Sequence, residues 1–107
     1  MKRKPVILRT RADQDVREAV DYYLREAGER VALAFVDALE RAFLHVASHP
    51  ASGSTRHVHA LDLPGLRSWP VKRYPYLLFY VDKDDHIDVW RVLHDQRDIP
   101  AWLREED

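Results

Sequence analysis

The sequence predicts an α+β fold in the order β-α-α-β-β-β, with a helical hairpin packed on one face of a twisted antiparallel sheet. Two short apolar runs, residues 76–81 and 87–93, are rich in Val, Ile, Tyr, Phe and Trp, and a charged linker separates them. That pattern is typical of a β-hairpin. Two longer segments, residues 12–27 and 31–46, instead repeat apolar residues every three or four positions, as amphipathic helices do. Short links between successive strands predict an antiparallel sheet. The apolar sides of the two helices need a surface to cover, so we expect the helical hairpin to pack on one face of this sheet.

The first half of the chain contains a short strand and the two helices. Residues 5–9 include the apolar run Val-Ile-Leu, which is compatible with one strand of the sheet. Thr10 followed by Asp13 is close to a capping box, so we expect the first helix to begin there. Gly28 is the expected C-cap of that helix. The second helix should end before Pro50.

The second half of the chain contains the remaining strands and a short terminal helix. Residues 48–55 combine proline, glycine and hydroxyl side chains, which is typical of a loop. Residues 56–63 alternate roughly between polar and apolar, and residues 66–71 predict a further strand. Pro70 has no amide donor, so it should lie at a sheet edge or a bulge. A short helix is expected at residues 99–103, where a proline fits the first turn.

Composition favours one folded domain and limits its partners. The chain has 107 residues, 46% apolar and 33% charged, so we expect a single domain over residues 1–107. Seventeen Lys and Arg nearly balance 18 Asp and Glu. The chain as a whole therefore has little attraction for nucleic acid, and we expect no direct sequence-specific DNA binding. No segment is typical of a signal peptide or a membrane span, which favours a cytoplasmic protein.

Several short motifs, in order along nearly the whole chain, resemble the RelE/ParE superfamily of bacterial toxins from type II toxin–antitoxin systems, and the ParE branch most. The motifs are Ala12-Asp13-x-Asp15, Tyr22-Tyr23, Ala34-Phe35, His49-Pro50-x-x-Gly53, Gly65-Leu66-Arg67, Tyr74-Pro75-Tyr76, Phe79-Tyr80 and Val92-Leu93-His94-x-x-Arg97-Asp98. The resemblance implies a toxin neutralised by a cognate antitoxin, ParD-like or other, in a toxin–antitoxin hetero-oligomer. ParE-like toxins are associated with poisoning DNA gyrase, whereas RelE-like relatives cut messenger RNA on the ribosome.

Basic residues around the last strands are the candidates for binding a target: Arg67, Lys72, Arg73, His94 and Arg97. In a ribonuclease alternative, His94 would transfer protons, since histidine is the side chain whose reference pKa lies nearest neutrality, and Arg67 and Arg73 would stabilise the charged transition state. The near balance of charge disfavours a chain that must grip ribosomal RNA. We therefore expect a gyrase inhibitor with no bond-breaking chemistry of its own.

The same residues also have structural interpretations. His94 could end a strand and bond the following loop, and Arg67 could form a fixed ion pair with an acidic residue such as Asp98. By strand alternation, Arg91 shares a face with Ile87, Val89 and Leu93, which favours structural pairing or antitoxin contact over catalysis. The candidates for antitoxin contact are Trp69, Tyr80, Trp90 and Arg91.

No cofactor or metal is expected. His57 and His59 would lie on the same side of a strand and could supply the first two ligands of a zinc site. The chain has no cysteine, however, and Asp62 has the opposite parity. A third functional alternative is an attenuated toxin that serves mainly in an autorepressing toxin–antitoxin complex.

Overall fold

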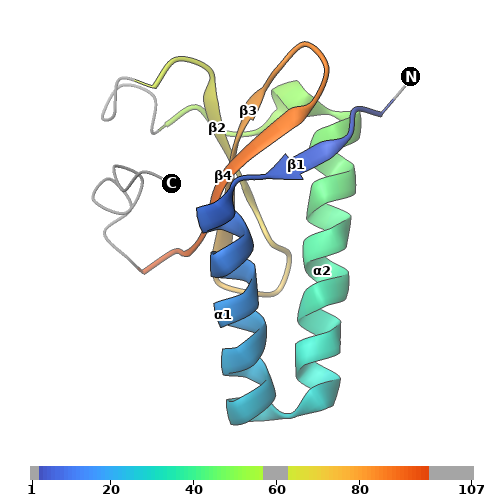
Figure 1. Ribbon diagram of the computed structural model, residues 1–107, viewed down its shortest axis with the longest axis vertical. Helices are drawn as coiled ribbons and strands as arrows, with labels where there is room; N and C mark the ends of the chain where they lie inside the picture. Colours follow the sequence, from blue (N-terminus) through green and yellow to red (C-terminus); the bar gives the residue numbers. More distant parts are fainter. Residues whose placement is uncertain (1–2, 57–62, 97–107) are drawn as a thin grey trace.

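The computed structural model describes residues 3–56 and 63–96 (Figure 1). In chain order it has β1 (Val6–Leu8), α1 (Thr10–Ala27), α2 (Glu29–Ser48), a short 3₁₀ helix η1 (Pro50–Ser52), β2 (Leu66–Pro70), β3 (Tyr76–Asp82) and β4 (Ile87–His94). This is a strand, two helices and three further strands, so the predicted α+β order is confirmed. The predicted helix at residues 99–103 and most of the predicted strand at residues 56–63 lie outside the described residues.

The four strands form one sheet in the order β1-β4-β3-β2. β3 pairs antiparallel with both β2 and β4, as their short connections predict. β1, in contrast, pairs parallel with β4, with Val6 opposite Ile87 and Leu8 opposite Val89. The sheet is therefore mixed rather than wholly antiparallel. Only strands joined by a short turn are obliged to run antiparallel, and both helices and two strands separate β1 from β4.

The helical hairpin packs on one face of the sheet and carries the main core. Gly28, with a φ of 91°, makes the turn between the helices, whose joined ends extend beyond the strands in Figure 1. The buried core unites α1, α2 and the sheet through Ala12, Ala19, Phe35, Leu39, Val46, Leu78, Tyr80, Ile87, Val89 and Val92. Burying each large apolar side chain contributes about 1.5–3 kcal/mol. A smaller cluster, Leu66, Phe79 and Leu93, lies on the opposite face.

A bulge in β4 changes which side chains share a face. Phe79 lies opposite Arg91, but the next residue, Tyr80, lies opposite Val89. Trp90 is therefore an extra residue, and alternation restarts after it. The prediction that Arg91 shares a face with Ile87 and Val89 is wrong for this reason, whereas Arg91 and Leu93, on the same side of the bulge, keep the predicted alternation.

Candidate binding sites

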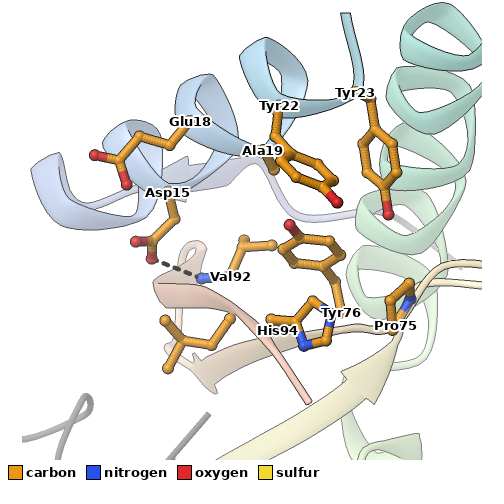
Figure 2. A pocket seen from close by; sticks show the side chains of 10 residues that line it. Asp15, Glu18, Ala19, Tyr22, Tyr23, Pro75, Tyr76, Val92 and His94 are labelled. Carbon is orange, nitrogen blue, oxygen red and sulfur yellow. Dashed lines mark hydrogen bonds between the residues drawn. The ribbon is translucent and has the colours of Figure 1, made fainter. Parts of the chain in front are cut away.

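α1 covers the edge of β4 beyond the end of β1, and Asp15 makes the connection. Its Oδ2 accepts the backbone N–H of Val92 at 3.0 Å, a bond drawn in Figure 2. The guanidinium of Arg91 donates to the same carboxylate at 2.7 Å from Nε and 2.8 Å from Nη2. The side chains of Asp15 and Arg91 are only 8% and 3% exposed. Arg91, a candidate for antitoxin contact, is therefore buried in a structural ion pair.

Beside this ion pair lies a cavity of about 410 Å³ between α1 and the ends of β3 and β4, here called the tyrosine cavity. Its wall includes Glu18, Tyr22, Tyr23, Tyr76 and His94. Figure 2 shows the hydroxyls of the three tyrosines on this one cavity. Burial, followed by the neighbouring tyrosines, raises the pKa of Tyr23. Tyr23 therefore presents a neutral hydroxyl to the cavity, and all three tyrosines offer aromatic surface to a ligand.

His94 lines the tyrosine cavity and also closes the loop after β4. Its Nδ1 accepts the backbone N–H of Gln96 at 3.1 Å, and its ring meets that of Tyr76 edge-on at 5.3 Å. The structural interpretation of His94, a bond to the following loop, is therefore realised. Because Nδ1 is occupied, only Nε2 is left for a ligand.

A second cavity, of about 490 Å³, lies between α2 and the β2–β3 turn and is here called the cationic cavity. It is lined by Ala34, Asp37, Ala38, Arg41, Ala42, His45, Trp69, Pro70, Lys72, Arg73 and Tyr74. The rings of Trp69 and His45 stack with centroids 3.8 Å apart at an interplanar angle of 13°. Trp69, Lys72 and Arg73, predicted separately as antitoxin and target contacts, thus share one cavity.

An aromatic cluster joins the walls of the two cavities. Tyr23 and Phe35 from the helices pack against Tyr74 and Tyr76 from the β2–β3 hairpin, with ring centroids 5.2–6.3 Å apart. Tyr76 lines the tyrosine cavity and Tyr74 the cationic cavity. The β2–β3 turn is therefore held in place from within, while Lys72 and Arg73 remain exposed at its tip.

Arg67 and Tyr80 hold the segment after α2 against the sheet. Arg67 Nη1 donates to the carbonyls of Ala51 and Gly53 at 3.1 and 2.9 Å. The Tyr80 hydroxyl donates to Pro50 O at 2.7 Å and accepts the N–H of Gly53 at 3.1 Å. Tyr80 has no exposed surface, so this candidate for antitoxin contact is inaccessible to a partner in the described conformation. Asp98, named as a possible partner of Arg67, lies outside the described residues.

Replacing Tyr80 with Phe is expected to lower the free energy of unfolding by about 1–3 kcal/mol, because the buried Gly53 N–H and the partly buried Pro50 O would lose their shared partner. Burial raises the pKa of Tyr80 above its usual 10.0, while the Gly53 N–H and the charge of Arg67 oppose this. Because the pKa of Tyr80 is raised in the folded state, the neutral hydroxyl contributes stability that is fully present below pH 10. This contribution is lost as the pH rises through the raised pKa of the folded protein. Urea denaturation near neutral pH should give a lower free energy of unfolding for Tyr80→Phe than for the wild type. At alkaline pH, the free energy of unfolding should decline less steeply with pH in Tyr80→Phe. Equal alkaline slopes in the two proteins would contradict this assignment.

Trp90 lies with the smaller cluster on the opposite face of the sheet. The guanidinium carbon of Arg9 sits 3.9 Å from its ring centroid, and Arg9 binds both Asp88 oxygens at 3.0–3.1 Å. The buried Trp90 Nε1 has no hydrogen-bond partner among residues 3–56 and 63–96. Trp90 itself lines neither of the two cavities.

The three residues of the ribonuclease alternative lie in different places. Arg67 binds the carbonyls after α2, Arg73 lines the cationic cavity and His94 lines the tyrosine cavity. Arg97, His57 and His59 lie outside the described residues. Within the described ranges, no three His, Asp or Glu side chains gather as a metal site would need. No helix there is long and apolar enough to cross a membrane.

Sequence reasoning missed the contribution of α2 to the cationic cavity. Arg41 and His45 are spaced four residues apart, and Ala34, Ala38 and Ala42 repeat at the same interval beside them. Such residues share one side of a helix. That spacing indicates a helix surface of small and basic side chains. It does not indicate that the β2–β3 turn lies opposite this surface.

The described fold is that of a small α+β protein with an open mixed sheet, a helical hairpin and two cavities beside the β2–β3 turn. A family model described as "ParE toxin of type II toxin-antitoxin system, parDE" matches residues 6–99. The chain therefore belongs to the ParE toxin family.

A solved structure has the same fold. It is described as "Chromosomal ParDE TA system from P. aeruginosa" and has a TM-score of 0.70 with 20% sequence identity, over 85% of this chain and 95% of that one. At that identity the similarity shows the fold alone. No curated protein matches the chain.

Proposed function

We propose that the chain is the toxin of a type II toxin–antitoxin module, that it inhibits DNA gyrase, and that direct binding of its cognate antitoxin neutralises it. The family match over residues 6–99 is the observation that carries this proposal. The relative from P. aeruginosa, described as a ParDE system, supports an antitoxin as partner. The protein would act in the cytoplasm and be stored as a toxin–antitoxin hetero-oligomer.

The arrangement of the basic residues supports inhibition by binding rather than RNA cleavage. Cleavage needs a proton acceptor, a proton donor and cations around one phosphate, all within hydrogen-bond reach. Here Arg67 and His94 are each engaged with backbone groups in separate parts of the fold. Lys72 and Arg73 are instead exposed together beside a cavity, as a protein-binding surface requires. We therefore propose Lys72 and Arg73 as the centre of the target-binding surface.

Supercoiling of relaxed plasmid by purified gyrase tests this function. Antitoxin-free protein is expected to reduce supercoiling and to trap a gyrase–DNA cleavage complex, and prior mixing with the antitoxin should restore supercoiling. Unaffected supercoiling with no trapped complex would remove gyrase as the target. Primer extension on translated messages after induction would then reveal the cuts that the ribonuclease alternative requires.

A further inference from the structure

We infer that the cationic cavity takes an acidic, amphipathic segment of the antitoxin, which places one bulky apolar side chain in the cavity and carboxylates against its basic rim. The inference rests on the proposed function, since it assumes an antitoxin as partner. It goes further by assigning the site, the chemistry of the segment and the way in which neutralisation occurs.

The inner surface of the cavity suits an apolar side chain. Its volume of about 490 Å³ lies within the range of about 300–1,000 Å³ typical of ligand pockets. Trp69, Pro70 and Tyr74 supply aromatic and aliphatic surface from the β2–β3 hairpin, and α2 supplies alanines. Because Ala34 is exposed and Ala38 half-buried, no long side chain projects there. A second helix or an extended segment can therefore approach the backbone of α2 closely.

The charge on the rim selects an acidic partner. Arg41, Lys72 and Arg73 line the cavity together with one acid, Asp37. All three cations are exposed, and none forms an ion pair with a described residue. Since the chain as a whole carries a net charge of −1, this is a local concentration of positive charge. Such a patch attracts carboxylates at short range and fixes the register of a bound segment.

The backbone of the β2–β3 turn has an unusual conformation at Arg73. Arg73 has a φ of 74°, and it is the only described residue other than glycine with a positive φ. That conformation is unfavourable for a residue with a side chain, whereas glycine adopts it freely. Strain of this kind is concentrated at binding and active sites. The turn thus holds an arginine on the cavity rim where glycine would be easier to accommodate.

A peptide fits the cavity better than a nucleic acid does. His45 already covers one face of Trp69 at 3.8 Å, so that face cannot stack on a base. Alanine methyl groups form much of the remaining wall, and they offer neither stacking nor base-specific hydrogen bonds. The tyrosine cavity does not compete for an acidic segment, because its own charged lining residues include Glu18 and the paired Asp15.

The shared use of Lys72 and Arg73 implies how neutralisation occurs. These side chains are the proposed centre of the target surface, and they also form the rim that would hold the antitoxin. A segment lying across them would cover them directly. Neutralisation would then follow from competition for one surface, with no change of the toxin's fold required.

Charge reversal with a matched control tests the inference. In the variant Lys72→Glu/Arg73→Glu, two attractive contacts become repulsive, so the Kd for purified cognate antitoxin should rise by about tenfold or more. The control reverses one exposed lysine and one exposed arginine away from the cavity, Lys83→Glu/Arg30→Glu, and its Kd should stay within about twofold of the wild type. Isothermal titration at about 50 and 500 mM NaCl should also show a weaker salt dependence in the cavity variant.

Two further variants keep the test decisive if charge reversal disturbs folding. Arg73→Gly relieves the backbone strain, so its melting temperature should not fall, but its affinity for the antitoxin should. The chain has no cysteine, so a single introduced thiol can be labelled with a maleimide. The antitoxin should protect the thiol of Ala34→Cys, at the cavity, and leave that of Lys83→Cys, in the β3–β4 loop, reactive.

The outcomes separate the inference from the proposed function. If the wild-type protein does not bind the antitoxin, the proposed function fails and the inference fails with it. If the wild type and the charge-reversed variant bind equally and the Ala34→Cys thiol is not protected, the inference is overturned while the proposed function stands. Loss of gyrase inhibition with unchanged antitoxin binding would also overturn it, since the cavity would then serve the target alone.

Discussion

Replacing Asp15 with Ala is expected to lower the free energy of unfolding by about 3–5 kcal/mol, because the substitution removes the buried carboxylate that pairs with the buried Arg91 guanidinium. Arg91 Nε and Nη2 each lie within 2.8 Å of an oxygen of the Asp15 carboxylate. The same substitution removes the acceptor of the Val92 N–H on the edge of β4. For a domain of this size, 1 kcal/mol corresponds to about 4–8 °C in melting temperature, so a loss of more than about 12 °C should be seen by circular dichroism.

The same helix provides a matched control for Asp15. Asp13 forms an ion pair with Arg17 at 3.0 Å, but the two side chains are 52% and 79% exposed. Such a surface pair contributes about 0.3–0.5 kcal/mol, so Asp13→Ala should be nearly neutral. Replacing both buried partners with Leu should recover part of the stability lost in Asp15→Ala, because neither half of the buried ion pair is then left without the other. Equal and small losses in Asp13→Ala and Asp15→Ala would contradict the role assigned to the buried pair.

The elements that the sequence predicted well are those whose signal is local. The periodicity of residues 12–27 and 31–46 corresponds to α1 and α2, and Gly28 ends the first helix as its position suggested. The strand runs at 66–71, 76–81 and 87–93 match β2, β3 and β4 within one residue at each end. Side-chain periodicity and turn chemistry are properties of neighbouring residues, so they can be read without knowing what packs against them.

The features that the sequence did not predict depend on distant contacts. The parallel pairing of β1 with β4 joins opposite ends of the chain, and the bulge at Trp90 arises from the match between two strands. The expected capping box is also absent. Arg9 is the N-cap of α1 and makes no side-chain capping bond, and Asp13 pairs instead with Arg17. A capping box requires the hydroxyl side chain at the N-cap, one residue before the helix. Thr10 is instead the first helical residue.

The candidate site was predicted in part. Lys72, Arg73 and Trp69 were selected for charge and aromaticity, and the structure brings them together at one cavity. Tyr80 and Arg91 were selected by the same criteria but are buried. Residue type indicates which chemistry a side chain can perform, whereas exposure depends on the whole fold. That is why Arg41, whose importance depends on the opposing β2–β3 turn, was missed.

Replacing Gly53 with Ala is expected to cost about 1–3 kcal/mol by overpacking. Gly53 has φ −69° and ψ 155°, a conformation open to any residue, so its backbone does not require glycine. Glycine is required because there is no room for a side chain: an added Cβ would collide with the Tyr80 hydroxyl and lie 2.9 Å from Arg67 Cβ and 3.0 Å from Ser68 O. All three neighbours belong to the sheet. The segment after α2 would therefore have to move away from β2 and β3.

A double-mutant cycle with Tyr80→Phe tests this explanation of Gly53. Removing the hydroxyl removes the worst collision, so Gly53→Ala should cost less in the Phe variant than in the wild type, by about 0.5 kcal/mol or more in urea denaturation. Gly28→Ala is a useful contrast, since a Cβ there meets nothing within 4 Å and only the φ of 91° opposes it. Its cost should be unaffected by Tyr80→Phe. Strictly additive losses at Gly53 and Tyr80 would show that close packing against the Tyr80 hydroxyl is not what excludes a side chain at position 53.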